Sequence, residues 1–485
     1  MKKRLPKNDG YLLVQILVFG AVAVVIISGL VAFAVANARL GRRVVLSEQA
    51  FQMAEAGLEY YRWHLAHAPE DYTDGTGNPG PYVKNFYDRN GVLLGTFTLT
   101  ITPPPLGSTL VTIQSKGIPS ADPTVERTIV SRLAIPSFAN FAAVTDAANR
   151  FGAGTEVFGP IHSNDGIRFD GLAHNIVTSF LSNYNDADHT GNNEFGVHTH
   201  VNAPPSSGIN NTFRPLEAPP NSVQARTDVF ITGRSFPAPE VQFSDITSDL
   251  EQIYDDATAS GLYFGDSGDE GYKIVLKTND TLDLYRVNSL QNVPGGCSSS
   301  GQSGWGSWTT NSTTLLGNYP FPANGLIFLD DHTWVEGTID TARITIVAAH
   351  IPDDSVNARK SLIVNNDVLY TNYDGTDAIA LIGQNNVNVG LYSDTNLRID
   401  AALVAQNGRA GRYLYESDCS PYHTRSTLTL YGTMISALRY GFAYVDGTGY
   451  ATRNLIYDSF LLYSPPPSFP KTEDFHEVIS WKEID

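Results

Sequence analysis

Apolar residues open the chain in one uninterrupted block, and an amphipathic stretch follows it. The 26 residues from Tyr11 to Ala36 carry no charge. At a rise of about 1.5 Å per helical residue they span about 39 Å, more than the hydrocarbon core of a bilayer. Basic residues lie on both sides of the block, namely Lys2, Lys3, Arg4 and Lys7 before it and Arg39, Arg42 and Arg43 after it. The pattern predicts a transmembrane helix over residues 11–36, with the N-terminus in the cytoplasm and the rest exported.

The helical period continues beyond these arginines. Small and apolar residues recur at spacings of three and four at Ala50, Ala54, Gly57, Leu58, Tyr61 and Leu65. This spacing predicts an amphipathic continuation of the helix over residues 37–68. A cleavable secretory signal is the alternative, because residues 34–36 and 36–38 have the small-x-small form of a cleavage site. An ordinary signal has a shorter apolar region of about 7–15 residues, so we expect the helix to be retained.

The start of the chain resembles the leader of type IV prepilins and pseudopilins. A short basic leader over residues 1–10 ends in Gly10 and is followed by the apolar run. In that family a prepilin peptidase cuts after the glycine on the cytoplasmic side, and the new N-terminal residue is methylated. The resemblance therefore implies Tyr11 as the methylated mature N-terminus. It also implies the prepilin peptidase and other pilins or pseudopilins as partners.

The fifth mature position departs from the family pattern. Most members carry a glutamate that pairs with the positive N-terminus of a neighbour, and this chain has Gln15. An ion pair in hydrocarbon is favourable only when both partners are present. Minor pseudopilins at a filament tip also lack the glutamate. Gln15 thus favours a rare initiating or tip subunit over a shaft subunit.

A second segment strengthens this resemblance. The sequence Ala54-Glu-Ala-Gly-Leu-Glu59 is similar to a segment of PilX-like minor pilins. Ala54, Glu55 and Gly57 are therefore candidate assembly residues, since small side chains allow another backbone to approach. Docking of the helix on its own domain is the alternative.

Alternating residues after the helix predict strands over 96–102, 109–115 and 125–133. A long helix followed by about three antiparallel strands resembles the pilin plan, so we expect a small pilin-like sheet module over residues 69–136. Residues 466–485, around Trp481, are expected to fold back as a C-terminal tail strand.

The region from 137 to 465 has a different character. Short apolar β segments recur there with Asn, Asp and Gly at the corners. They predict a β-solenoid, similar to a right-handed β-helix, with a β-sandwich as the alternative. An insertion of loops is expected over 181–322, with one helix over 241–258 capped near Ser244. The fold class is therefore mainly β with a long N-terminal α-helix, a pilin-like α+β module followed by a solenoid.

Motifs in this large region carry a further resemblance. Gly159-Pro-Ile-His-Ser-Asn164 and the C-terminal stretch 462–483 resemble large uncharacterised proteins with a PilX-like N-terminus. That group implies a location and an architecture, and no activity.

Charge and cysteine content limit the function further. The net charge is −18, and seven of the 32 basic side chains lie in the first 43 residues, so the exported part is more acidic still. Such a surface repels phosphates and argues against nucleic acid as a partner. Cys297 and Cys419 are expected to form one disulfide in an exported domain, with two free thiols as the alternative.

Two short segments carry candidate metal ligands. Asp186, Asp188 and Glu194 supply oxygen ligands that Ca²⁺ favours, although the EF-hand pattern fails at Val197, and a solvated acidic turn is the alternative. His198 and His200 have the spacing that places two imidazoles on one side of a strand. These two imidazoles could form a transition-metal site with further ligands from His162, His174 or the nearby His189. The alternative is that the histidines are structural and form hydrogen bonds with the backbone of loops. No cofactor is required by the sequence.

Signals for catalysis are weak. The chain has no Gly-x-Ser-x-Gly motif, phosphate loop or HExxH motif. A row of acidic residues would suit a carbohydrate enzyme, and its members are Asp330, Asp331, Glu336, Asp340 and Asp400. A group of aromatic residues would suit the binding of a surface glycan or protein, and its members are Trp305, Trp308, Tyr319 and Trp334.

We therefore expect a non-enzymatic, bacterial membrane-anchored protein of the minor pilin type. It would assemble at the tip or base of a type IV pilus or related secretion filament, with adhesion as a further role. The alternatives are a tethered surface binding protein outside any filament and a solenoid carbohydrate enzyme.

Overall fold

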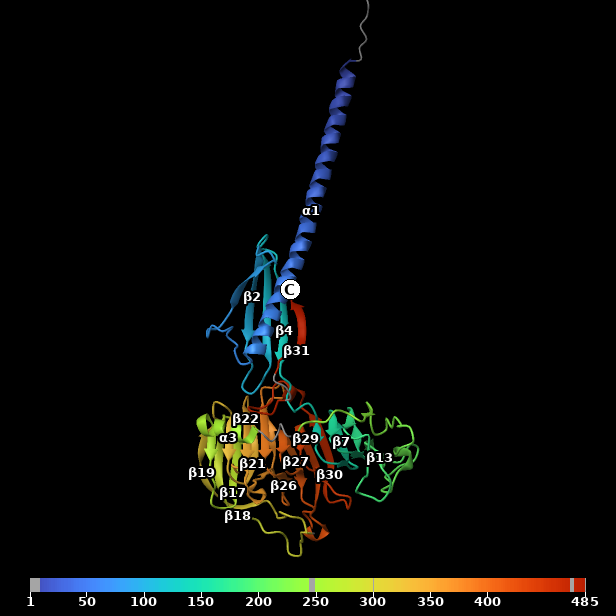
Figure 1. Cartoon of the computed structure of the whole chain (residues 1–485), viewed down its shortest axis with the longest axis vertical. Coiled ribbons are helices and arrows are strands. Elements are labelled where there is room, and N and C mark those ends of the chain that lie inside the picture. Colours follow the sequence, from blue (N-terminus) through green and yellow to red (C-terminus); the bar gives the residue numbers. More distant parts are fainter. Residues whose placement is uncertain (1–8, 244–248, 300, 472–474, 485) are drawn as a thin grey trace, which may run out of the picture. The chain divides into compact units, whose positions relative to one another are not determined.

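The chain divides into two compact units, which are described separately (Figure 1). The computed structural model describes residues 9–243, 249–299, 301–471 and 475–484. The first unit, here the helix–sheet unit, comprises Met1–Pro103, Val111–Ala134 and Phe475–Asp485, and the second, here the ladder unit, comprises Pro104–Leu110 and Ile135–Asp474. Most of the predicted leader (1–8) and the predicted helix cap at Ser244 lie outside the described residues.

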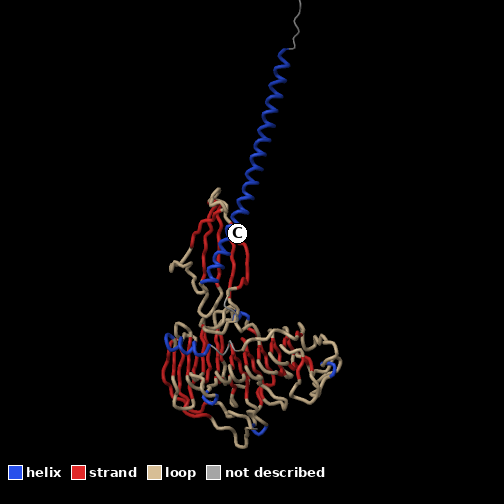
Figure 2. Tube along the Cα trace, in the orientation of Figure 1, coloured by secondary structure: helices blue, strands red, loops and turns tan. Residues whose placement is uncertain are grey.

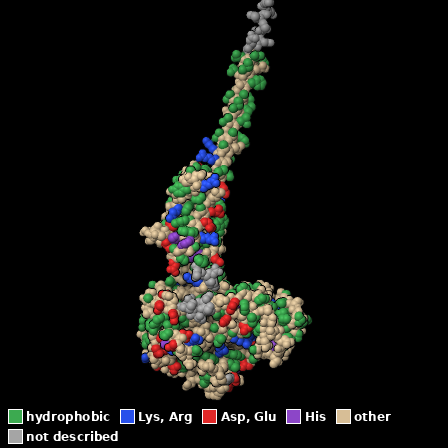
Figure 3. Space-filling view, in the orientation of Figure 1, with side chains coloured by type: hydrophobic (Ala, Val, Ile, Leu, Met, Phe, Trp, Pro, Cys, Tyr) green, Lys and Arg blue, Asp and Glu red, His purple; other side chains and the backbone are tan. Residues whose placement is uncertain are grey.

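One helix, α1 (Asp9–His67), covers both the predicted transmembrane and amphipathic stretches without a break. Every residue from 11 to 45 is exposed, and a buried stripe begins at Leu46. Figure 3 shows the apolar side chains that cover this exposed part of the helix. In the described part of the chain, α1 is the one helix long and apolar enough to cross a membrane.

An antiparallel sheet packs on the second half of α1. Its strand order is β1-β2-β3-β4-β31, and the strands are β1 (Tyr82–Tyr87), β2 (Leu93–Thr102), β3 (Val111–Pro119), β4 (Arg127–Ala134) and β31 (Glu477–Ile484). The strands alternate, so that Phe97, Leu99 and Ile113 face the buried helix residues Leu58 and Tyr61. Strand β1 was not predicted.

Strand β31 comes from the end of the chain. It pairs antiparallel with β4, from Glu477 opposite Ala134 to Ile484 opposite Thr128. The Arg127 guanidinium forms an ion pair with Glu483 across the two strands. The larger segment of the ladder unit, Ile135–Asp474, is therefore inserted between two neighbouring strands of one sheet.

The ladder unit is mostly β (Figure 2), and most of its strands pair in parallel. One ladder runs through β22 (Arg343–Ala348), β25 (Ala378–Gly383), β27 (Asn396–Ala405) and β29 (Thr424–Ser436). The next strand in that ladder is β5 (Ala143–Thr145), which pairs with residues 434–436 of β29. Strands from the two ends of this unit's chain thus meet in the middle of the ladder.

The order of strands follows from this meeting point. From β5 the ladder continues through β8 and β11 to β15, and from β22 it continues the other way through β20 to β16. The chain crosses from one end of the ladder to the other between residues 236 and 261. Part of this crossing is α3 (Asp249–Ser260).

The remaining elements of the ladder unit are short strands and single 3-10 turns. They are β6 (Asn149–Phe151), β7 (Thr155–Phe158), β8 (Ile161–Ser163), β9 (Ile167–Phe169), β10 (Leu172–Ala173), β11 (Val177–Ser179), β12 (Asn183–Tyr184), β13 (Glu194–Phe195), β14 (Val197–His198), η1 (Pro215–Glu217), β15 (Arg234–Ser235), β16 (Leu262–Phe264), β17 (Gly271–Lys277), β18 (Thr281–Leu290), β19 (Thr310–Pro320), β20 (Leu326–Leu329), β21 (Thr333–Ile339), η2 (Val356–Ala358), β23 (Leu362–Ile363), β24 (Val368–Tyr370), β26 (Val387–Val389), β28 (Ala410–Arg412), η3 (Ser417–Cys419), β30 (Gly449–Tyr457) and η4 (Ser459–Leu462).

The prediction of a loop-rich insertion over 181–322 is wrong for its second half. Strands β17, β18 and β19 form antiparallel pairs, and β17 also pairs in parallel with β21. The signal was present in the sequence, because Tyr272, Ile274 and Leu276 alternate and a turn at Asn279-Asp280 follows them. The predicted helix over 241–258 is described only from Asp249.

Two cores flank the ladder. On β25, Ile379 and Leu381 point into the inner core, whereas Ala378, Ala380 and Ile382 belong to an outer core. The outer core also contains Leu250, Ile253 and Ala257 of α3. Helix α3 therefore covers part of one outer face of the ladder, over β16 and β20.

Candidate functional site

The candidate assembly residues on α1 fall into two groups. Ala54 and Gly57 are buried, whereas Tyr11, Gln15 and Glu55 are exposed. A Cβ atom on Gly57 would lie 2.2 Å from the Ser115 hydroxyl oxygen and 2.9 Å from the Phe97 ring. The two small residues thus dock α1 on its own sheet, the alternative weighed from the sequence. Gln15 and Glu55 remain open to another molecule.

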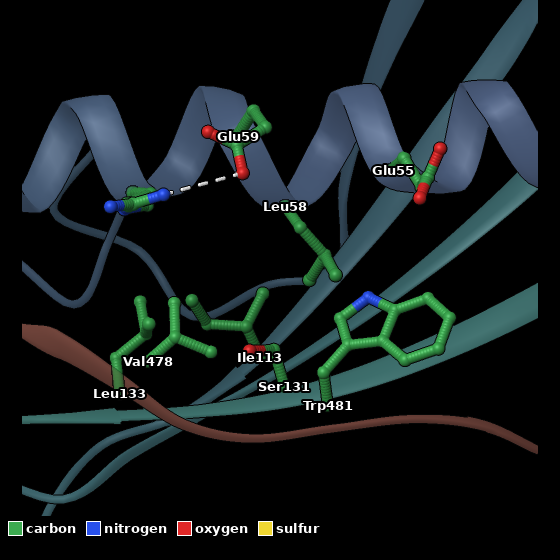
Figure 4. Close-up of a pocket in the computed structure, with 9 residues that line it drawn as sticks. Glu55, Leu58, Glu59, Ile113, Ser131, Leu133, Val478 and Trp481 are labelled. Atoms are coloured by element: carbon green, nitrogen blue, oxygen red, sulfur yellow. Dashed lines mark ion pairs between the residues drawn. The ribbon is translucent and has the colours of Figure 1, made fainter.

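A groove of about 430 Å³ lies beside the buried half of α1 (Figure 4). Its apolar wall consists of Leu58 of the helix and Ile113, Leu133, Val478 and Trp481 of the sheet. Figure 4 places Glu55 and Glu59 on the helix side, and Glu59 forms an ion pair of 3.6 Å with Arg62. Because Val478 and Trp481 belong to β31, this wall is complete only when the C-terminal strand is in place.

Three histidines and two carboxylates converge near one end of the ladder. Asp186 and His189 lie on the loop between β12 and β13, Glu194 begins β13, and His198 and His200 lie on and just after β14. Four of the five are almost completely buried, with exposed fractions of 4% for Asp186 and 0% for Glu194, His198 and His200. The His189 side chain is 5% exposed.

The ligand atoms of four residues of this His–carboxylate cluster, Asp186, His189, Glu194 and His200, lie within 4.8 Å of one another, and His198 contacts both carboxylates. The Nε2 atom of His198 lies 3.3 Å from Glu194 Oε2 and 3.5 Å from Asp186 Oδ2. The Nε2 atom of His189 lies 3.0 and 3.6 Å from the same two oxygens. The Nε2 atom of His200 lies 3.3 Å from Glu194 Oε1.

Neighbouring groups hold the cluster in place from outside. The Asp188 amide donates to Asp186 Oδ1 at 2.9 Å, and the Arg214 amide donates to Glu194 Oε1 at 2.8 Å. Asp186 Oδ2 and His198 Nε2 are buried and have no hydrogen-bond partner of their own. Buried polar atoms are rarely left in this state, so the pair calls for an explanation such as a bound water molecule or ion.

Electrostatics keep both carboxylates of the cluster ionised. Burial raises the pKa of the Asp186 carboxyl, but the facing His198 and the Asp188 amide outweigh it and hold that pKa well below its usual range. The pKa of Glu194 is also lowered, because His200 and His198 offset the effect of burial. The cluster therefore offers two negative charges and three imidazoles.

The structure changes the membership predicted for this site. Asp188 does not belong to the cluster, because its carboxylate pairs with Arg439 at 2.7 Å and Arg150 at 3.1 Å. His162 faces Thr178 and Asn164, and His174 faces Glu156. His189 does belong to it, and its spacing of three residues after Asp186 was the available signal.

The two cysteines form a disulfide bond between Cys297 and Cys419, whose Cα atoms are 4.5 Å apart. Aromatic side chains surround this bond, including Trp305, Trp308 and Tyr415. Of the other predicted aromatics, Trp334 is 3% exposed and Tyr319 packs edge-on against Phe264. These rings fill loops and cores instead of forming an exposed platform for a sugar.

The carboxylates of the predicted acidic row are engaged locally, one residue at a time. Each carboxylate has its own polar partner, as in the pairs Asp330–His350, Asp331–Lys360, Glu336–Lys273, Asp340–Asn372 and Asp400–Arg398. A glycosidase mechanism needs a pair of carboxyl groups flanking the same bond. Among the described residues, each carboxylate of this row instead contacts its own partner.

The acidic segment Asp266–Glu270 also lacks a ligand cluster within the described part of the chain. The Asp266 carboxylate accepts the Gly268 amide, and Asp269 pairs with Arg286 at 3.1 Å. These contacts belong to a surface turn.

Comparison with known proteins adds one structural similarity. No protein-family model matches the chain, and no curated protein matches it. Among solved structures, the chain is similar to the competence-associated pilin ComZ from Thermus thermophilus, with 14% sequence identity and a TM-score of 0.32. The similarity covers 90% of this chain and 97% of that one. A similarity of this size assigns neither a fold nor a function to the chain.

Proposed function

We propose that this chain is a membrane-anchored, pilin-like structural subunit. Residues 11–36 of α1 span the cytoplasmic membrane with the N-terminus inside, and the sheet of the helix–sheet unit and the whole ladder unit lie outside. During assembly, the apolar half of α1 leaves the bilayer and packs against the corresponding helices of other pilin-like subunits.

The exposed half of α1 carries this proposal. From residue 11 to 45 no side chain is buried against the chain's own sheet or ladder. Large apolar side chains in a continuous stretch of this length do not remain in water. A bilayer and a bundle of similar helices are the two surroundings that satisfy both the apolar side chains and the helical backbone.

A minor position at the tip or base of a filament suits the rest of the chain. Gln15, which lies on the exposed half of α1, brings no charge to pair with a neighbouring N-terminus. The ladder unit is far larger than the helix–sheet unit, so dense repetition of the subunit along a shaft would be difficult. We propose adhesion through a surface glycan or protein as a secondary role of the ladder unit.

We interpret the ladder unit as a β-solenoid, and its parallel pairings support this interpretation over a β-sandwich, which is built from antiparallel sheets. We also propose that the protein is not an enzyme. The separate polar partners along the acidic row and the packing of the aromatic side chains in loops and cores support a structural role.

Immunogold labelling of purified filaments tests the proposal. A tip or base subunit gives sparse labels at filament ends, and a Gly10→Val variant, which blocks leader removal, gives none while the protein stays in the membrane fraction. A chain found in the membrane and absent from every filament would support the tethered binding protein instead. Dense labels along the shaft would contradict the minor role.

A further inference from the structure

We propose that the His–carboxylate cluster of Asp186, His189, Glu194, His198 and His200 binds one divalent first-row transition-metal ion. Zn²⁺ fits the set best. The ion fastens the loop that precedes β13 to the end of the ladder. Four observations carry this inference, namely the direction of the ring nitrogens, the spacing of the ligand atoms, the charge of the cluster and its place in the fold.

The hydrogen bonds of the Nδ1 atoms of two histidine rings determine which ring nitrogen carries the proton and which carries a lone pair. His200 Nδ1 lies 2.6 Å from the Asn210 carbonyl oxygen, and His198 Nδ1 lies 3.3 Å from the Phe195 carbonyl oxygen. A carbonyl oxygen accepts a hydrogen bond and never donates one, so Nδ1 carries the proton in each ring. In the neutral rings Nε2 then presents a lone pair to the carboxylate oxygens. Such a backbone contact to Nδ1 is the usual support of a metal-bound histidine.

Acceptors that face acceptors repel one another unless a cation lies between them. The nitrogen-to-oxygen distances in the cluster are 3.0, 3.3, 3.5 and 3.6 Å. Two ligand atoms that each lie about 2.0–2.1 Å from one ion at a tetrahedral angle are about 3.4 Å apart. The spacing of the cluster therefore matches atoms that share an ion.

The charge of the cluster equals that of a divalent cation with neutral histidines. Asp186 and Glu194 supply two negative charges, and Arg168, which is paired with Asp170 at 2.7 Å, also lies 3.8 Å from Asp186 Oδ2. The rival explanation is that protons take the place of the ion. It requires imidazolium rings with centroids only 4.9 and 5.2 Å apart, and like charges at that separation repel one another.

The ligand set selects the class of metal. Imidazole nitrogen suits zinc, copper, nickel and iron, whereas Ca²⁺ takes six to eight oxygen ligands. The Ca²⁺ site considered for the segment 186–194 is therefore disfavoured once three histidines join it. Nearly complete burial of the ligands is typical of a structural site, since a catalytic site keeps a position open.

The place of the cluster indicates what the ion does. Strand β14 is the outermost strand of the small ladder β14-β9-β6. An outermost rung has one side without a neighbour, and repeat folds need a cap there. Because the ligands join the β12–β13 loop to β14, one ion would hold this cap on the last rung.

Metal analysis of the full-length, tag-free protein in detergent tests the inference. After loading with Zn²⁺ and dialysis to remove free ions, we expect about one zinc per chain by mass spectrometry of the elements. His198→Gln and Glu194→Gln should lose most of it, and the matched control His174→Gln, which lies outside the cluster, should keep it. A wild-type chain that retains less than about a tenth of an ion would overturn the proposal.

A second measurement covers variants that fold poorly. Co²⁺ bound by this nitrogen and oxygen set gives visible d–d absorption of four- or five-coordinate type, and Zn²⁺ should bleach it. His189→Gln alters the most accessible ligand and should weaken both signals while the circular dichroism spectrum stays unchanged. Preferential retention of Ca²⁺ over Zn²⁺, or equal zinc content in His189→Gln, His198→Gln and wild type, would contradict the inference. Neither result bears on membrane anchoring by α1.

Discussion

The two units use sheets of opposite kinds, and the burial of their strands differs accordingly. In β3 of the helix–sheet unit, buried and half-exposed residues alternate along the whole strand. In β22 and β25 of the ladder unit every residue is buried. An antiparallel sheet can leave one face in water, whereas these parallel strands have a core on each face.

This difference predicts which positions of each unit tolerate a polar substitution. In the helix–sheet unit, α1 covers one face, and polar residues such as Gln114 and Lys116 occupy positions of β3 that are not buried. In the ladder unit the inner core fills one face of β25, and the outer core fills the other. A polar substitution should therefore be tolerated on alternate positions of the first unit and nowhere along β25.

The largest effect is expected from a charge on the outer face of β25. Ala380→Asp places a carboxylate in an apolar core that offers it no partner, and we expect a loss of about 4 kcal/mol or more in the free energy of unfolding. The matched control is Thr100→Asp on the exposed side of β2, which should change it by about 0.5 kcal/mol or less. Thermal unfolding and limited proteolysis measure both. Equal stability of the two variants would remove the distinction between the units.

Loss of the disulfide should affect the ladder unit alone. Cys297 and Cys419 are 122 residues apart, and both belong to that unit. A Cys297→Ser, Cys419→Ser double variant should lose about 2–4 kcal/mol, because the bond restricts the unfolded chain. Calorimetry with and without a reductant measures this. The reductant should lower the melting temperature of the ladder unit in wild type and should leave it unchanged in the double variant. A shift in the melting temperature of the helix–sheet unit would be evidence against independent units.

Glycine substitutions separate the two halves of α1. Gly57→Ala forces a methyl group against Ser115 and Phe97, so we expect a loss of about 1–3 kcal/mol in the helix–sheet unit. Gly29→Ala is the matched control, since nothing lies within 4 Å of its added methyl group. It should leave that unit's melting temperature unchanged. A larger effect at Gly29 would mean that the first half of the helix also packs on its own domain.

Acid should act on the two units in opposite directions, with the smallest effects. Hydrogen bonds from Thr73 lower the pKa of Asp71 to about 2, so the helix–sheet unit loses stability as the pH falls from about 4 to 2. Burial raises the pKa of Asp458 to about 6, so the ladder unit loses stability as the pH rises from about 4 to 6. Asp71→Asn and Asp458→Asn should each flatten the corresponding part of a melting-temperature profile. If the dependence of the melting temperature on pH is unchanged in either variant, another titratable group determines that part of the dependence.

The sequence was informative wherever the structural signal is local. The apolar block and the three- and four-residue spacing predicted α1, because a helix repeats within a few residues. Three strands of the helix–sheet unit were predicted with shifted ends, and β1 was missed because Tyr82–Tyr87 has only one buried residue. The tail strand around Trp481 was also expected.

Long-range order was beyond sequence reasoning. Strand β5 pairs with β29, almost 300 residues later, and a parallel pairing leaves no turn between its partners to reveal it. The candidate metal ligands were flagged by residue type alone. Asp188 was included wrongly because the distant Arg439 determines where its side chain points, and His189 was noted only as a neighbour.

Mass spectrometry of the mature N-terminus tests the central claim most directly. The account of a pilin-like subunit predicts a chain that begins at methylated Tyr11 and retains the whole of α1. An intact Met1, or a chain that begins after Ala36 or Ala38, would contradict it.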